Sequence, residues 1–155
     1  MTRSPSPAAR RRGATAVETA AVISIALLFI FGIIEYARLI YFFHVADNAA
    51  REGARYAVVH TGDGTTTAQV KAVVTAAMSG QDASLNPGTF AVNIYSANPA
   101  TGQALANSTW TDAPFAGSVA VEVSGTYKFI LPTFLRFSGP TLPVKVRSLM
   151  MSEAN

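Results

Sequence analysis

Residues 10–38 read RRRGATAVETAAVISIALLFIFGIIEYAR, and this stretch decides the fold. Three arginines precede an apolar run from Ala14 to Ile34, in which Glu18 is the single charged residue. At about 1.5 Å per residue, such a run forms a helix of roughly 30 Å, which is the thickness of a bilayer core. The stretch therefore predicts a helix that crosses a membrane once.

The flanks of this helix predict its orientation. Arg10, Arg11 and Arg12 directly precede the span, and basic residues beside a span favour the cytoplasmic side. We therefore expect residues 1–13 to form a basic cytoplasmic leader and the C-terminal part to lie outside the cytoplasm. A cleaved secretory signal would end in small residues, whereas this run continues into the bulky and charged residues 31–38.

The composition excludes several classes of protein. Half of the 155 residues are hydrophobic, and the net charge of +3 comes from the leader, since the chain after Gly13 has eight basic residues against nine acidic ones. A nucleic-acid-binding face is therefore not expected. The absence of cysteine excludes disulfides, thiolate metal sites and a cysteine nucleophile.

Catalytic and cofactor motifs are also missing from the sequence. His44 and His60 are sixteen residues apart without a carboxylate cluster, so their spacing does not favour a metal site. There is no glycine-rich phosphate loop and no nucleophile motif with a base at an informative spacing. We expect neither an enzyme nor a bound cofactor, although a polar pocket in an anchored domain is an alternative that the sequence leaves open.

The helix is predicted to continue well beyond the membrane. No proline or glycine cluster interrupts it before residues 61–64, so it runs from about Ala14 to His60, with a span at 14–34 and an amphipathic part at 35–60. Glu35 and Arg38 are three residues apart and can pair. Apolar or small residues at steps of three and four predict a packing face made of Tyr36, Ile40, Phe43, Ala50, Ala54, Ala57 and Val58.

Small residues in the second half of the helix predict close packing. Gly53 and the alanines around it, Ala50 and Ala54 among them, allow close backbone approach, while Arg51 and Arg55 share another face. Two interpretations remain open: the helix packs only on its own domain, or its remaining faces also pack on neighbouring helices.

Residues 61–155 are predicted to form an extracytoplasmic α+β domain. A helix is expected at 67–79, and alternating apolar residues predict strands at 89–96, 118–129 and 142–151. Together they suggest a short antiparallel sheet on the long helix. Trp110 is expected to anchor the loop 97–117, and the apolar segment 129–137 is either a core-filling connector or a contact with a partner or membrane surface.

Glu18 requires an explanation, because a carboxylate inside a span costs roughly 2.5–3.5 kcal/mol on insertion scales. One interpretation places Glu18 at the headgroup level, where this cost is small. The other begins from Gly13: cleavage after this residue would give Ala14 a cationic amine, and Glu18 of one subunit could then pair with the amine of a neighbour.

The first 60 residues resemble a known family. The block RRRGATAVE at 10–18, the apolar run, GIIEYARL at 32–39 and NAAREGARYA at 48–57 are similar to TadE-like proteins, and the last block is the most specific. Thr19 departs from the pattern, since prepilins of the tight-adherence type usually carry an aromatic residue there.

The resemblance implies a function in pilus assembly. It suggests a bacterial inner-membrane minor pseudopilin of a tight-adherence, type IV-like pilus, with roles linked to cell adhesion or secretion. Its implied partners are a prepilin peptidase cutting between Gly13 and Ala14, other pilins or pseudopilins, the inner-membrane assembly platform and membrane lipid. The alternative is an uncleaved, membrane-anchored scaffold of a secretion or pilus apparatus.

Overall fold

The computed structural model describes residues 7–106, 108–130 and 141–152, with only the backbone described for residues 7–12. The chain has an α+β fold, as predicted, in which two helices pack on a three-stranded antiparallel sheet with strand order β1-β2-β3. The elements are α1 (Pro7–Val59), α2 (Thr67–Ala77), the 3-10 turns η1 (Gln81–Ser84) and η2 (Trp110–Asp112), and the strands β1 (Ala91–Ala97), β2 (Ser118–Tyr127) and β3 (Leu142–Met151).

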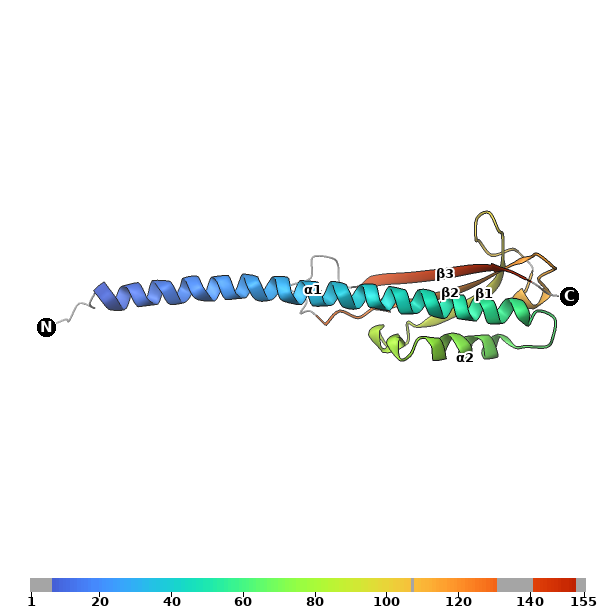
Figure 1. Ribbon diagram of the computed structural model, residues 1–155, viewed down its shortest axis with the longest axis horizontal. Coiled ribbons are helices and arrows are strands. Elements are labelled where there is room, and N and C mark those ends of the chain that lie inside the picture. The colour runs from blue at the N-terminus through green and yellow to red at the C-terminus, as the bar shows by residue number, and fades with distance from the viewer. Residues whose placement is uncertain (1–6, 107, 131–140, 153–155) are drawn as a thin grey trace.

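Helix α1 is much longer than the domain that packs on it. Its 53 residues correspond to about 80 Å at the usual rise. Figure 1 shows the sheet and α2 beside the second half of α1, while the first half extends alone. The helix begins at Pro7 rather than at the expected Ala14, because proline is favoured in a first turn and the alanines and arginines that follow are strong helix formers.

The sheet packs on α1 through its strands β2 and β3. Val119, Val121 and Val123 of β2 are buried, and β2 pairs along its length with β1 on one side and with β3 on the other. These valines alternate, which is what the sequence pattern predicted, and all three predicted strands lie within two residues of the observed ones.

The second half of α1 buries a face that differs in part from the predicted one. Ala50, Ala54, Ala57 and Val58 are buried as expected, but Tyr36, Ile40 and Phe43 are exposed, and the predicted face was wrong there. Phe42 is buried instead, one residue or about 100° around the helix from Phe43. Apolar residues occur on every face between positions 36 and 43, so periodicity alone did not select the buried one.

Helix α2 packs beside α1 at a glycine, Gly53. A Cβ atom added at Gly53 would lie 2.3 Å from Cγ2 of Val74, so no larger residue fits without a shift. A capping box between Thr66 and Gln69 begins α2. Gly80, the predicted end signal, follows the helix with φ at +79°.

The long loop before β2 is fixed by its tryptophan, as predicted. Trp110 is 3% exposed and packs with Ala57, Val58, Val70 and Val119. Its indole Nε1 donates a hydrogen bond to Oγ1 of Thr67, 2.9 Å away. After β2, Phe129 packs on the main core, the group of buried side chains that includes Phe42, Val121 and Tyr127. Residues 131–137 of the predicted apolar connector lie outside the described residues.

Candidate functional site along the long helix

The predicted processing segment lies on the free half of α1. Gly13, Ala14 and Glu18 are exposed, and a Cβ atom at Gly13 would meet nothing within 4 Å. The predicted leader residues Arg10, Arg11 and Arg12 continue the helix, and their side chains lie outside the described residues. The segment is therefore open to a partner on all of its described faces.

The apolar half of α1 fits a single-pass membrane protein. Its most apolar stretch of 18 residues has a mean hydropathy of 2.5, and none of these residues is buried within the chain. Two of the hydroxyl side chains there bond to the backbone of their own helix: Thr19 donates to the carbonyl of Thr15 at 2.9 Å, and Ser24 to that of Ala20 at 2.8 Å. These bonds satisfy the hydroxyl groups without water, as an apolar surrounding requires.

A polar cluster, the exit clamp, joins α1 to the domain immediately after the apolar run. It consists of Glu35, Arg38 and Tyr127 with the backbone of the segment 128–130. Glu35, only 7% exposed, lies 3.4 Å from Arg38 and accepts a hydrogen bond from the backbone N–H of Ile130 at 3.1 Å. Arg38 in turn donates to the carbonyl of Lys128. The predicted Glu35–Arg38 pair thus also fastens a distant segment to the helix.

Tyr127 completes the exit clamp from β2. The guanidinium of Arg38 lies 4.8 Å from the centre of the Tyr127 ring, a cation–π contact. Burial, partly opposed by the charge of Arg38, raises the pKa of Tyr127 to about 12. The Tyr127 phenol therefore stays protonated at neutral pH. The cluster contains one acidic side chain, Glu35, and one basic side chain, Arg38.

The small residues predicted to serve helix packing contact the chain's own domain. Ala50 and Ala54 are buried in the main core, and Gly53 lies against Val74. Arg51 lies on another face, where its exposed side chain pairs with Asp47 at 3.0 Å. The face with Arg51 and the apolar half of α1 are consequently the parts of the helix left for other partners.

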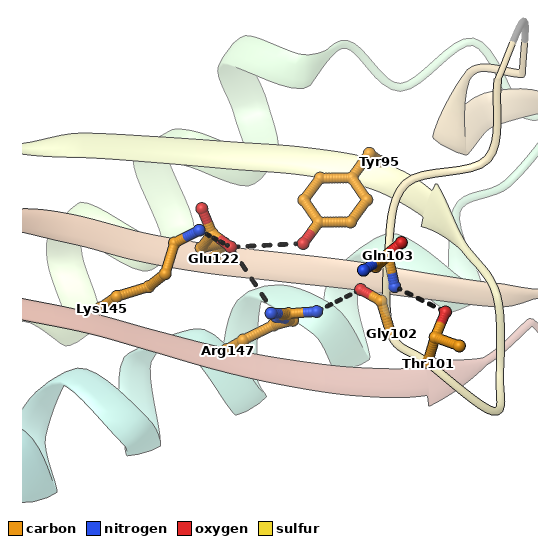
Figure 2. Close-up of polar contacts among 7 residues, drawn as sticks. All are labelled: Tyr95, Thr101, Gly102, Gln103, Glu122, Lys145 and Arg147. Atoms are coloured by element: carbon orange, nitrogen blue, oxygen red, sulfur yellow. Dashed lines mark hydrogen bonds and ion pairs between the residues drawn. The ribbon is translucent and has the colours of Figure 1, made fainter.

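A buried acid on the outer face of the sheet was not predicted. Glu122, 6% exposed, lies 2.9 Å from Lys145 and 3.7 Å from Nε of Arg147, and Tyr95 donates a hydrogen bond to it at 3.3 Å. Figure 2 shows Arg147 also donating to the carbonyl of Gly102. The cluster thereby attaches the loop around Gly102 to the sheet.

Only the strand register brings these groups together. Glu122 is paired with Arg147 on β3, and Lys145 lies two residues before Arg147 on the same strand. The sequence signal for Glu122 was its position between Val121 and Val123. Side chains alternate along a strand, so Glu122 lies on the face of the sheet opposite to the valines. Its partners lie more than twenty residues away and depend on a register that the sequence pattern does not give.

Comparison with known protein families found a match that lies within α1. Residues 13–55 match the model of a family described as TadE-like protein, and the match confirms the predicted resemblance. Comparison with curated proteins and with solved structures found no match. The matched region contains the apolar half of α1, the residues Glu35 and Arg38, and the small residues that contact α2. The long helix is therefore similar to TadE-like proteins over residues 13–55.

Proposed function

We propose that this chain is a minor pseudopilin that takes part in the assembly of a tight-adherence, type IV-like pilus. In this proposal it inserts in the bacterial inner membrane with Arg10, Arg11 and Arg12 in the cytoplasm and the domain outside. The observation that carries the proposal is α1 itself, a helix similar to TadE-like proteins whose most apolar 18-residue stretch is 0% buried. The role is structural rather than enzymatic.

The proposed processing step is hydrolysis of the peptide bond between Gly13 and Ala14 by a prepilin peptidase. Water adds across this bond, which leaves a carboxylate on Gly13 and a protonated amine on Ala14. The exposure of Gly13 supports access to the bond. A protease must unwind α1 locally, and glycine lowers the cost because it is about 1 kcal/mol less favourable in a helix than alanine.

Glu18 provides the proposed link between subunits. It lies one helical turn beyond Ala14, and no ion pair joins it to another side chain that the structure describes. A carboxylate in an apolar bundle is costly unless it is paired with a cation. The new amine of a neighbouring subunit would supply this cation and fix the axial register of the two helices.

Helix packing in the filament accounts for the remaining apolar surface. Exposed apolar side chains along residues 14–34 require either lipid or neighbouring apolar helices. A subunit that leaves the bilayer must bury this surface again, and bundling with other pilins or pseudopilins would do so. The inner-membrane assembly platform is the proposed partner for this transfer.

An uncleaved envelope scaffold is the alternative. Two observations favour it: Thr19 occupies the position where an aromatic residue is usual, and α1 continues through Gly13 without a break. In a scaffold the free half of α1 would serve as a permanent anchor, and the leader would remain attached.

Peptidase treatment of the purified protein distinguishes these functions. The full chain in detergent is incubated with an active prepilin peptidase, and its mass is measured before and after. The proposal predicts loss of residues 1–13 from the wild type and an intact Gly13→Leu variant, which retains its fold because the site is open. An intact wild-type chain under the same conditions would favour the scaffold.

A further inference from the structure

The segment Lys128–Ile130, which we call the basal segment, is held at one fixed level along α1. The N–H of Ile130 donates to Glu35, and the carbonyl of Lys128 accepts from Arg38. Glu35 is the first residue after the apolar run. The end of β2 is therefore attached to α1 at the point where the helix would leave a bilayer.

This level corresponds to the lipid headgroups. The headgroup layer adds about 5–7 Å to each side of the hydrocarbon core, which is four or five helical residues. If residues 14–34 span the core, Glu35 and Arg38 both lie in this layer. The basal segment, bonded to both residues, then lies in the same layer.

The exposed groups at this level suit a phospholipid surface. The side chain of Ile130 is 72% exposed, and that of Tyr36 of α1 is 66% exposed. Tyrosine is enriched at membrane interfaces, and the exposed Lys128 can reach lipid phosphates while its stem remains on apolar surface. The acid at this level, Glu35, is buried and paired with Arg38, so it does not oppose the contact.

We propose that the basal segment is a second membrane contact, in which Ile130 is immersed in the headgroup layer of the outer leaflet and Lys128 meets the lipid phosphates. The domain then rests on the bilayer at a fixed tilt instead of swinging freely about α1. The proposed partner is a bilayer because the exposed Ile130 is held at the level of Glu35, the first residue after the apolar run. The inference rests on the membrane insertion of the proposed function but not on cleavage after Gly13.

The absence of native cysteines makes a direct test possible. Single-cysteine variants Ile25→Cys, Ile130→Cys and Phe115→Cys carry an environment-sensitive fluorophore and are reconstituted, uncleaved, in phosphatidylethanolamine–phosphatidylglycerol vesicles. Ile25 lies near the middle of the span, and Phe115 lines a surface cleft with Thr61, beyond the far end of α1. All three side chains are more than half exposed, so labelling should preserve the fold. Emission of Trp110, the single tryptophan, monitors folding.

The label at position 130 should emit at shorter wavelength than the label at 115. It should also be quenched more strongly by lipids with a nitroxide at the headgroup than by iodide in the water. Equal emission and equal iodide quenching at 130 and 115, with the label at 25 protected, would overturn the inference. A label at 25 that is open to iodide would instead contradict the membrane insertion on which both proposals rest.

The exit clamp can be tested in the same assay. Adding Glu35→Ala to the Ile130→Cys variant should shift the label toward the values found at position 115, because the basal segment loses its attachment to α1. Glu122→Ala is the matched control, since it removes an equally buried acid that is remote from α1, and it should leave the label immersed. An immersed label in the Glu35→Ala variant would show that the exit clamp does not hold the basal segment in the headgroup layer.

Discussion

The carboxylate of Glu35 accepts a hydrogen bond from the backbone N–H of Ile130, 3.1 Å away, across 95 positions of sequence. This bond connects the last turn before the domain with the end of β2. Together with the ion pair to Arg38, it fixes where the α+β domain begins along α1.

Removing Glu35 should therefore destabilise the domain. We expect Glu35→Ala to lower the free energy of unfolding by about 2–4 kcal/mol, because it leaves the partly buried Arg38 without its partner and the N–H of Ile130 without its acceptor. Urea unfolding in detergent micelles, followed by the fluorescence of Trp110, measures this change.

The control for this prediction is Arg51→Ala on the same helix. Arg51 forms an ion pair with Asp47 in which the side chains are 64% and 39% exposed, so its loss should cost less than about 1 kcal/mol. Equal effects of the two substitutions would contradict a structural role for the exit clamp.

The contact between α1 and α2 should not tolerate a methyl group. Gly53→Ala is expected to destabilise the protein by about 1–3 kcal/mol, because the new Cβ would lie 2.3 Å from Val74. The double variant Gly53→Ala with Val74→Ala should recover part of this loss. Thermal unfolding followed by circular dichroism provides the measurement.

Gly32→Ala serves as the matched control for Gly53→Ala. A Cβ at Gly32 meets nothing within 4 Å, so this variant should unfold at the wild-type temperature or slightly above it. If Gly53→Ala were equally well tolerated, the close approach of the two helices would be refuted.

Alkaline pH should weaken the domain through Tyr127. Its pKa is raised from 10.0 to about 12, so the folded state holds this proton more tightly than the unfolded state does. The resulting stability is fully present below pH 10 and is lost as the pH rises from 10 toward 12. The difference in unfolding free energy between the wild type and Tyr127→Phe isolates the effect, because other titrating groups are common to both. A constant difference from pH 8 to 12 would argue against the predicted shift.

Glu18 should affect assembly and not processing. Because the proposed cut by a prepilin peptidase lies before Ala14, the variants Glu18→Gln and Glu18→Leu are expected to be cleaved, but they lose the carboxylate proposed to pair with a neighbour's amine. The amount of mature chain in the membrane and in sheared pili should show normal cleavage and a strong loss from pili. Normal incorporation of Glu18→Leu would rule out the pairing.

The sequence was most informative where the pattern is local. The apolar run at 14–34, the alternating valines of β2 and the face of α2 with Val70 and Val74 each carry their signal in a few neighbouring residues. The long apolar helix and the elements of the domain could therefore be predicted. The pairing of Glu35 with Arg38 was likewise within reach, because it depends on a spacing of three residues.

The parts that escaped prediction depend on contacts between distant residues. The buried face of α1 was misplaced near Phe42, because residues 36–43 are apolar on all sides and only the packed sheet selects one face. The ion pairs of Glu122 with Lys145 and Arg147 follow from strand register, and the attachment of Ile130 to Glu35 follows from where β2 ends. None of these relations has a signature in a short stretch of sequence.

The N-terminus of the mature protein tests the central claim most directly. Intact-mass spectrometry of the chain from native membranes and from sheared pili would establish it in both places. The account predicts a chain that begins at Ala14 in both fractions, and a Gly13→Leu variant that keeps its leader and is absent from pili. A wild-type chain that retains Arg10, Arg11 and Arg12 in cells with active prepilin peptidase would contradict the account and identify an uncleaved scaffold.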